Sequence, residues 1–201
     1  MNQIISDSGV KPKQVAIFTH GIKRGPFARL GTTLSRGFQE RGVDCDLVIL
    51  QTTPAQLAKY PDVNVVPLNV KRAAFSLLPL VKYLRDKQPE IVFAMPSYFN
   101  LIAIWARALA GVQSKIIIGE HNICSLETKI EQGEKLKIRY LPLLMRYVYP
   151  AGDGLIGVCG DTLKDLATEM NIKPDIPLKV IPNPIDVKQI QQLAQESLDC
   201  P

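Results

Sequence analysis

Seven short runs of apolar and β-branched residues recur along the chain, at 15–19, 45–50, 63–68, 90–94, 115–119, 154–158 and 178–181. Most of them do not alternate polar with apolar residues, which is typical of strands covered on both faces. Helix-like segments separate most of these runs, at 26–42, 75–87, 98–110, 127–149 and 161–170. Strands that alternate with helices favour right-handed crossovers and a parallel sheet. We therefore expect a Rossmann-like three-layer α/β/α domain with a mostly parallel sheet.

The length of 201 residues suits one α/β domain followed by a short tail. The segment 51–62 contains proline and threonine and predicts a loop without a clear helix. Near the end of the chain, Pro182 and Pro184 flank Asn183 and predict a rigid turn of the kind found at domain boundaries. We therefore assign residues 1–186 to the domain and 187–201 to the start of a linker or a helical tail.

The charge and the cysteines narrow the class of protein. The chain has 24 Lys and Arg against 19 Asp and Glu, so its net charge of +5 favours anionic partners; a solvated basic surface is the alternative. Four widely spaced cysteines and two histidines predict neither a disulfide framework nor a metal site, and a cytoplasmic location follows. No apolar run reaches the roughly 18 residues of a membrane span. The aromatic and basic residues do not form a nucleic-acid-binding pattern.

In open parallel sheets, ligands bind outside the carboxyl ends of the strands, which here selects residues 20–27, 95–98 and 120–125. The first of these loops contains Gly21 and Gly25, and glycine followed by a helix N-terminus suits a diphosphate. Arg24 and Arg29 would add positive charge. The loop is neither a dinucleotide fingerprint nor a P-loop. The alternative is that the glycines only permit a tight turn and that the arginines are solvated.

Three polar residues, Glu120, His121 and Asn122, follow the apolar run at 115–119. A histidine at the carboxyl end of a central strand could accept a proton, donate a hydrogen bond to a sugar or support a reacting phosphate. The alternative is a turn cap in which Glu120 and Asn122 satisfy backbone groups.

The segment from Lys129 to Arg146 is basic and contains aromatic residues. An amphipathic helix of this composition could lie on an anionic bilayer. An ordinary surface helix with one side in the core is the alternative.

Four segments resemble, in the same order, the N-terminal domain of a GT-B retaining glycosyltransferase of family 4. They are the loop at 25–29 with the helix that follows it, the His-containing turn at 120–122, the strand at 151–159 and the segment at 180–186, which reads Val-Ile-Pro-Asn-Pro-Ile-Asp. Pro26 stands where the family often has its second glycine. The resemblance covers residues 15–186.

This resemblance implies a nucleotide-sugar donor and a glycan or lipid-linked acceptor, with no cofactor or metal. It places Gly21, Gly25, Arg24 and Arg29 at the donor diphosphate. It gives His121 the catalytic position facing the transferred sugar, whereas Glu120 and Asn122 would orient the turn or contact the acceptor.

The family's C-terminal domain would hold most of the donor, and we expect it to be absent from these 201 residues, so that the chain alone is inactive. The implied enzyme is cytoplasmic, peripheral on the membrane and active in polysaccharide biosynthesis. The alternative from another class is a non-enzymatic α/β module whose basic face binds a membrane or a protein.

Overall fold

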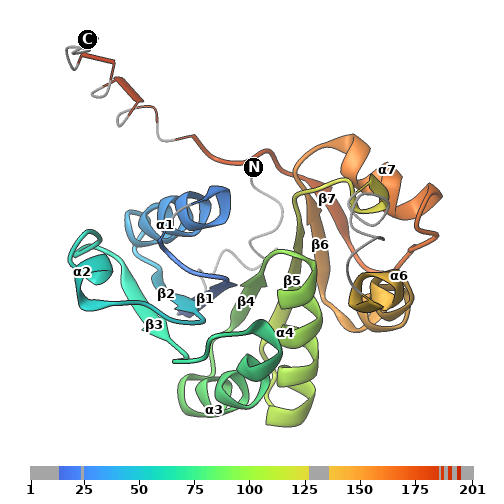
Figure 1. Ribbon diagram of the computed structural model, residues 1–201, viewed down its shortest axis with the longest axis horizontal. Coiled ribbons are helices and arrows are strands. Elements are labelled where there is room, and N and C mark those ends of the chain that lie inside the picture. Colours follow the sequence, from blue (N-terminus) through green and yellow to red (C-terminus); the bar gives the residue numbers. More distant parts are fainter. Residues whose placement is uncertain are drawn as a thin grey trace.

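One sheet organises the molecule. The computed structural model describes residues 14–23, 25–126, 136–185, 187, 190, 191, 194 and 195. Within them, seven strands pair in the order β3-β2-β1-β4-β5-β6-β7, and every neighbouring pair is parallel (Figure 1). The strands are β1 (Gln14–Thr19), β2 (Asp44–Ile49), β3 (Asn64–Pro67), β4 (Ile91–Ala94), β5 (Lys115–Glu120), β6 (Gly154–Gly157) and β7 (Leu178–Val180). The predicted Rossmann-like sheet is confirmed.

The helices fill the connections between these strands. They are α1 (Pro26–Gln39), α2 (Pro54–Leu57), α3 (Leu77–Lys87), α4 (Ser97–Ala110), α6 (Leu136–Val148) and α7 (Gly160–Thr168), with 3-10 turns η1 (Ala73–Ser76) and η2 (Tyr149–Ala151). The predicted helix at 127–149 is observed from residue 136, and its beginning lies outside the described residues. The predicted tail at 187–201 lies mostly outside them as well.

The expectation that 51–62 contains no helix is wrong, because α2 occupies part of it. Thr53 caps this single turn: its hydroxyl accepts from the Gln56 amide, and the Gln56 side chain accepts from the Thr53 amide. Pro54 is at the first helical position, where its missing N–H costs nothing. The Thr-Pro-x-Gln pattern is a capping box that the sequence displays.

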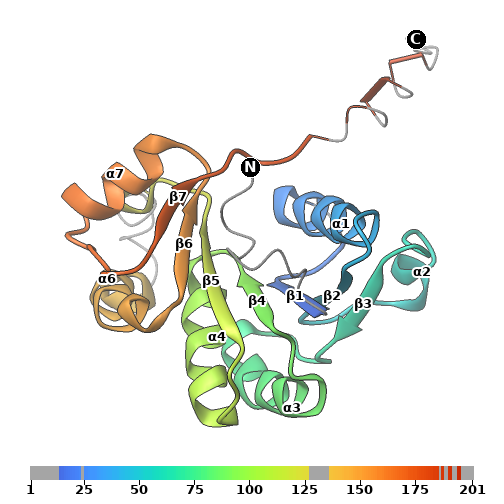
Figure 2. The same ribbon diagram turned by 180° about the vertical axis from the view of Figure 1, so that it is seen from behind.

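Helices cover both faces of the sheet, and each face has its own apolar core. Figures 1 and 2 show α1 on one side of the sheet and α3 and α4 on the other. The core beneath α1 includes Val15, Ile17 and Leu47, which have at most 1% of their surface exposed. The core on the opposite face joins residues of α3, α4, α6 and α7 to the intervening side chains of the same strands. Burial on both faces explains why the strands lack polar alternation.

The strand order creates a switch point between β1 and β4. The chain proceeds from β1 outward to β2 and β3, and then returns to place β4 on the other side of β1. The connections that follow β1 and β4 therefore diverge, and ligands of open α/β sheets bind in the crevice beside such a point. In the described part of the chain, no helix is both long and apolar enough to cross a bilayer.

Candidate functional site

The loop between β1 and α1 ends at a helix N-terminus without a side-chain cap. Gly25 is the N-cap residue, and its φ of 106° is a conformation that L side chains rarely adopt. Pro26 follows at the first helical position and has no N–H. The amides of Phe27 and Ala28 are therefore the ones that the end of α1 presents to a ligand. Gly21 is half-buried in the same loop, and Arg24 lies outside the described residues.

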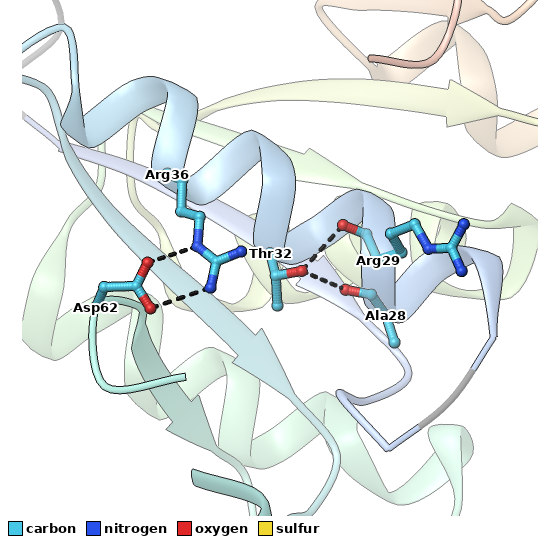
Figure 3. Close-up of polar contacts among 5 residues, drawn as sticks. All are labelled: Ala28, Arg29, Thr32, Arg36 and Asp62. Atoms are coloured by element: carbon cyan, nitrogen blue, oxygen red, sulfur yellow. Dashed lines mark hydrogen bonds and ion pairs between the residues drawn. The ribbon is translucent and has the colours of Figure 1, made fainter. Parts of the chain in front are cut away.

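Arg29 is an exposed cation on the first turn of α1. Figure 3 shows the Arg29 side chain pointing away from Thr32, toward the N-terminal end of the helix. Arg29 forms no ion pair within the described residues. Arg36, two turns further on, is instead held by Asp62, with Nε–Oδ2 and Nη2–Oδ1 distances of 2.5 and 3.1 Å. This pair connects α1 to the segment before β3. Arg29 has no such partner among the described residues, so its charge can interact with an anionic ligand.

Glu120 is the last residue of β5, and its side chain is completely buried. Its Oε1 accepts hydrogen bonds from Tyr149 Oη and from Asn100 Nδ2 at 2.8 Å, and its Oε2 accepts from Ser97 Oγ at 3.1 Å and from Cys124 Sγ at 3.4 Å. Burial raises the pKa of the Glu120 carboxyl, and the four donors oppose that rise. Four donors therefore hold the Glu120 carboxyl group in one orientation, and none of its side chain is exposed.

His121 follows immediately and contacts two other segments. Its ring packs edge-on against Phe27, with the centroids 5.3 Å apart, and hydrogen-bonds to the side chain of Asn183 beyond β7. Its Nε2 atom is buried and has no hydrogen-bond partner among the described residues. Burial lowers the pKa of His121 below its ordinary value of 6.5, so the imidazole is neutral at pH 7.

The structure thus brings together some of the predicted residues and adds others. His121 lies against the first turn of α1, so the predicted catalytic and diphosphate-binding segments are neighbours. Asn122 is half-buried, and its carbonyl lies 3.9 Å from Cys124 Sγ. The predictions did not include Phe27 or Asn183, which both contact His121.

Ser97, Asn100 and Tyr149 also belong to the Glu120 network, and none of them was named as a site residue, although Ser97 lies in the predicted ligand-binding segment 95–98. The first two are polar positions spaced i and i+3 on α4, a mostly apolar helix. That spacing is a signal that a shared polar partner exists, although it does not identify the partner. Among the described residues, no group of three or more His, Cys, Asp or Glu side chains is placed to hold a metal ion.

The parallel sheet, the switch point and the loops at one edge define a fold class, the Rossmann-like N-terminal half of a GT-B fold. The sequence model of Glycosyltransferase Family 4 matches residues 28–189, and the chain belongs to that family. No curated protein sequence matches the chain.

Solved structures show the same fold at low sequence identity. Anabaena Alr3699/HepE in complex with UDP-glucose has a TM-score of 0.64 and 13% identity, over 90% of this chain and 50% of that one. The lipopolysaccharide outer core galactosyltransferase WaaB in its apo form has a TM-score of 0.59 and 14% identity, over 87% and 46%. A sucrose-phosphate synthase structure from Thermosynechococcus elongatus has 0.59 and 12%, over 90% and 96%. The chain spans about half the length of the first two proteins.

Proposed function

We propose that this chain is the acceptor-side domain of a retaining glycosyltransferase that transfers a sugar from a nucleotide-sugar donor to a glycan or lipid-linked acceptor. Membership of the family supports the reaction class. A similar fold binds UDP-glucose in Anabaena Alr3699/HepE, which supports the donor class. The domain supplies one wall of the reaction cleft, so the chain alone is inactive until a nucleotide-sugar domain completes it.

One observation carries this proposal: a neutral histidine with an unpaired ring nitrogen lies against the N-terminus of α1. We assign the unpartnered Nε2 of His121 to a hydrogen bond with the transferred sugar, which requires the side chains that bury this atom to move. When the bond between sugar and diphosphate breaks, negative charge develops on the diphosphate. The Phe27 and Ala28 amides and the Arg29 guanidinium can stabilise this charge.

The test uses a protein in which this chain is joined to its nucleotide-sugar domain. His121→Ala should lower kcat by more than about tenfold, which corresponds to about 1.4 kcal/mol. His121→Gln keeps a hydrogen-bonding side chain without the titration, and it should recover part of that loss. Unchanged kinetics in folded His121→Ala would remove His121 from the site. Measurable transfer by the 201-residue chain alone would contradict the requirement for a second domain, and an inverted anomeric product would contradict retention.

A second candidate property, binding to a membrane surface, is supported by α6. Tyr140, Leu143, Leu144 and Tyr147 are spaced i, i+3, i+4 and i+7 and are all exposed, between 40% and 75%. The helix is therefore apolar on its outer side as well as on the side that faces the core. An exposed apolar stripe next to basic residues suits peripheral binding to an anionic bilayer, as on the cytoplasmic face of a membrane.

Co-sedimentation with vesicles tests this binding. Phosphatidylserine-containing vesicles should retain the protein better than pure phosphatidylcholine vesicles, and Leu144→Ser with Tyr147→Ser should weaken the retention. Leu78→Ser is the matched control, because Leu78 is an exposed leucine on α3, 72% accessible. Retention that is unaffected by the anionic lipid content, or by charge reversal at Lys135, Lys137 and Arg139, would refute membrane binding.

A further inference from the structure

A cavity of about 380 Å³ opens between the β1–α1 loop and α2, outside the carboxyl ends of β1 and β2. It is lined by Ile22, Lys23, Gln56, Lys59 and Tyr60. Its volume falls within the usual range for small-molecule sites. We propose that this cavity binds the anionic group, a phosphate or a carboxylate, of a sugar acceptor. This inference rests on the proposed transferase function.

The described lining of the cavity is positively charged, because it contains two lysines. Lys23 and Lys59 are both exposed, and neither forms an ion pair within the described residues. None of the lining residues in the described part of the chain is a carboxylate. Asp62, which follows soon after Lys59 in the chain, is held by Arg36 in the pair described above. Two ammonium groups at one cavity without a counter-charge create a positive local potential, which attracts an anion.

The uncharged lining residues Gln56 and Tyr60 can contact the rest of a sugar. The Gln56 Oε1 atom already accepts from Thr52 Oγ1 and from the Thr53 amide, both at 3.2 Å, so its NH₂ group remains as a donor. The Tyr60 ring is half-buried, with the Arg36 guanidinium carbon 5.9 Å from its centroid. An aromatic ring fixed in this way offers an apolar face and a hydroxyl to a ligand that is both apolar and polar, as a sugar ring is.

The position of the cavity favours the acceptor over the donor. The donor diphosphate is expected at the N-terminus of α1, where Phe27 contacts His121 on the β5 side of the sheet. The cavity shares Ile22 and Lys23 with the β1–α1 loop, but its other lining residues belong to α2 and the turn after it. These follow β2, which lies on the opposite side of β1 from β5. An acceptor can therefore place its charged group here without displacing the donor.

Binding to the 201-residue chain tests the proposal, with glucose 6-phosphate and glucuronate as anionic probes and glucose as the neutral one. Titration calorimetry or NMR should detect both anionic sugars, and their affinity should fall as salt is added. Because a hydrogen bond to a charged group is lost in each case, Lys23→Ala and Lys59→Ala should each weaken binding by about tenfold. Lys164→Ala is the matched control, since Lys164 is an exposed lysine on α7 that forms no ion pair with any residue that the structure describes.

Four results would overturn the proposal: equal binding of glucose, binding that survives both lysine substitutions, equally tight binding of inorganic phosphate, or displacement of the sugar phosphate by UDP. The last result would assign the lysines to the donor. These measurements need no transfer reaction. If the two-domain protein transfers no sugar while the chain still binds anionic sugars through these lysines, the proposed function fails and the anion site stands.

Discussion

Replacing Tyr149 with phenylalanine would remove a single hydroxyl group from the buried network around Glu120. The Tyr149 side chain is completely buried, its Oη donates to Glu120 Oε1, and it accepts from Asn100 Nδ2 at 3.3 Å. Phenylalanine fills nearly the same volume, so the packing is retained. The loss of a hydrogen bond to a charged group predicts a free energy of unfolding lower by about 1.5–3 kcal/mol. In a domain of this size, the melting temperature should fall by about 3–12 °C.

The pH dependence of this loss identifies the partner of the hydroxyl group. Tyr149 holds the pKa of Glu120 lower than burial alone would set it, so Tyr149→Phe raises that pKa further. The pKa of Glu120 in the folded protein exceeds its ordinary value of 4.5, so the folded state binds this proton more tightly than the unfolded chain does. The proton therefore stabilises the fold fully below pH 4.5, and this stabilisation is lost as the pH rises through the folded pKa. The deficit of the variant should therefore grow as the pH rises above 4.5 and through the pKa of the folded carboxyl group.

Urea unfolding of both proteins across this range measures the deficit. Tyr83→Phe is the matched control, because the buried Tyr83 hydroxyl donates to Asp46 Oδ2 at 2.7 Å on a different strand. Both variants should lose stability, but only Tyr149→Phe should shift the ring signals of His121 in an NMR spectrum. A deficit that stays the same at all pH values, or one below about 0.5 kcal/mol, would refute the role given to this network.

Three further predictions concern the site and the sheet beneath it. Gly119→Ala should lower the free energy of unfolding by about 1–3 kcal/mol in a urea titration, because the new Cβ would lie 2.8 Å from the Phe93 ring and 3.0 Å from the Ala94 carbonyl oxygen. Gly25→Ala should cost about 1–3 kcal/mol by the same assay, from backbone strain, because a φ of 106° with a ψ of 171° is a region that glycine alone adopts readily. Apart from the adjacent residues, no described atom lies within 4 Å of the added Cβ. Because the pKa of folded His121 lies below 6.5, the protein should lose stability as the pH falls through that value, and His121→Gln should reduce this loss in unfolding curves recorded from pH 6.5 to about pH 5.

The fold was predictable because its signals are local. Each strand lies within one residue of the apolar run that predicted it, since burial on both faces requires an apolar run and little else. The short helix α2 was missed because four residues carry no periodicity, although its capping box was readable in Thr53 and Gln56. The order of the strands was not predicted, because it depends on which edges pair and not on any one segment.

Residues of the candidate site could be predicted only where they are close to one another in the sequence. Glu120 and His121 stand out because polar residues follow an apolar strand directly. The partners of Glu120 come from positions between 4 and 29 residues away, and Asn183 reaches His121 from still further along the chain. Contacts of this kind depend on the folded arrangement of β4, β5 and β7, which leaves no spacing rule in the sequence.

The strand order also sets a length scale for the proposed acceptor. β2 and β5 are separated by three steps in the sheet, through β1 and β4, and each step spans about 4.8 Å, so their carboxyl ends stand about 14 Å apart. The α2 side of the cavity follows the first of these ends, and His121 follows the second. A molecule that touches both must be extended, so small fragments can occupy either end without bridging them. Shortening an acceptor should therefore uncouple its binding from its reaction.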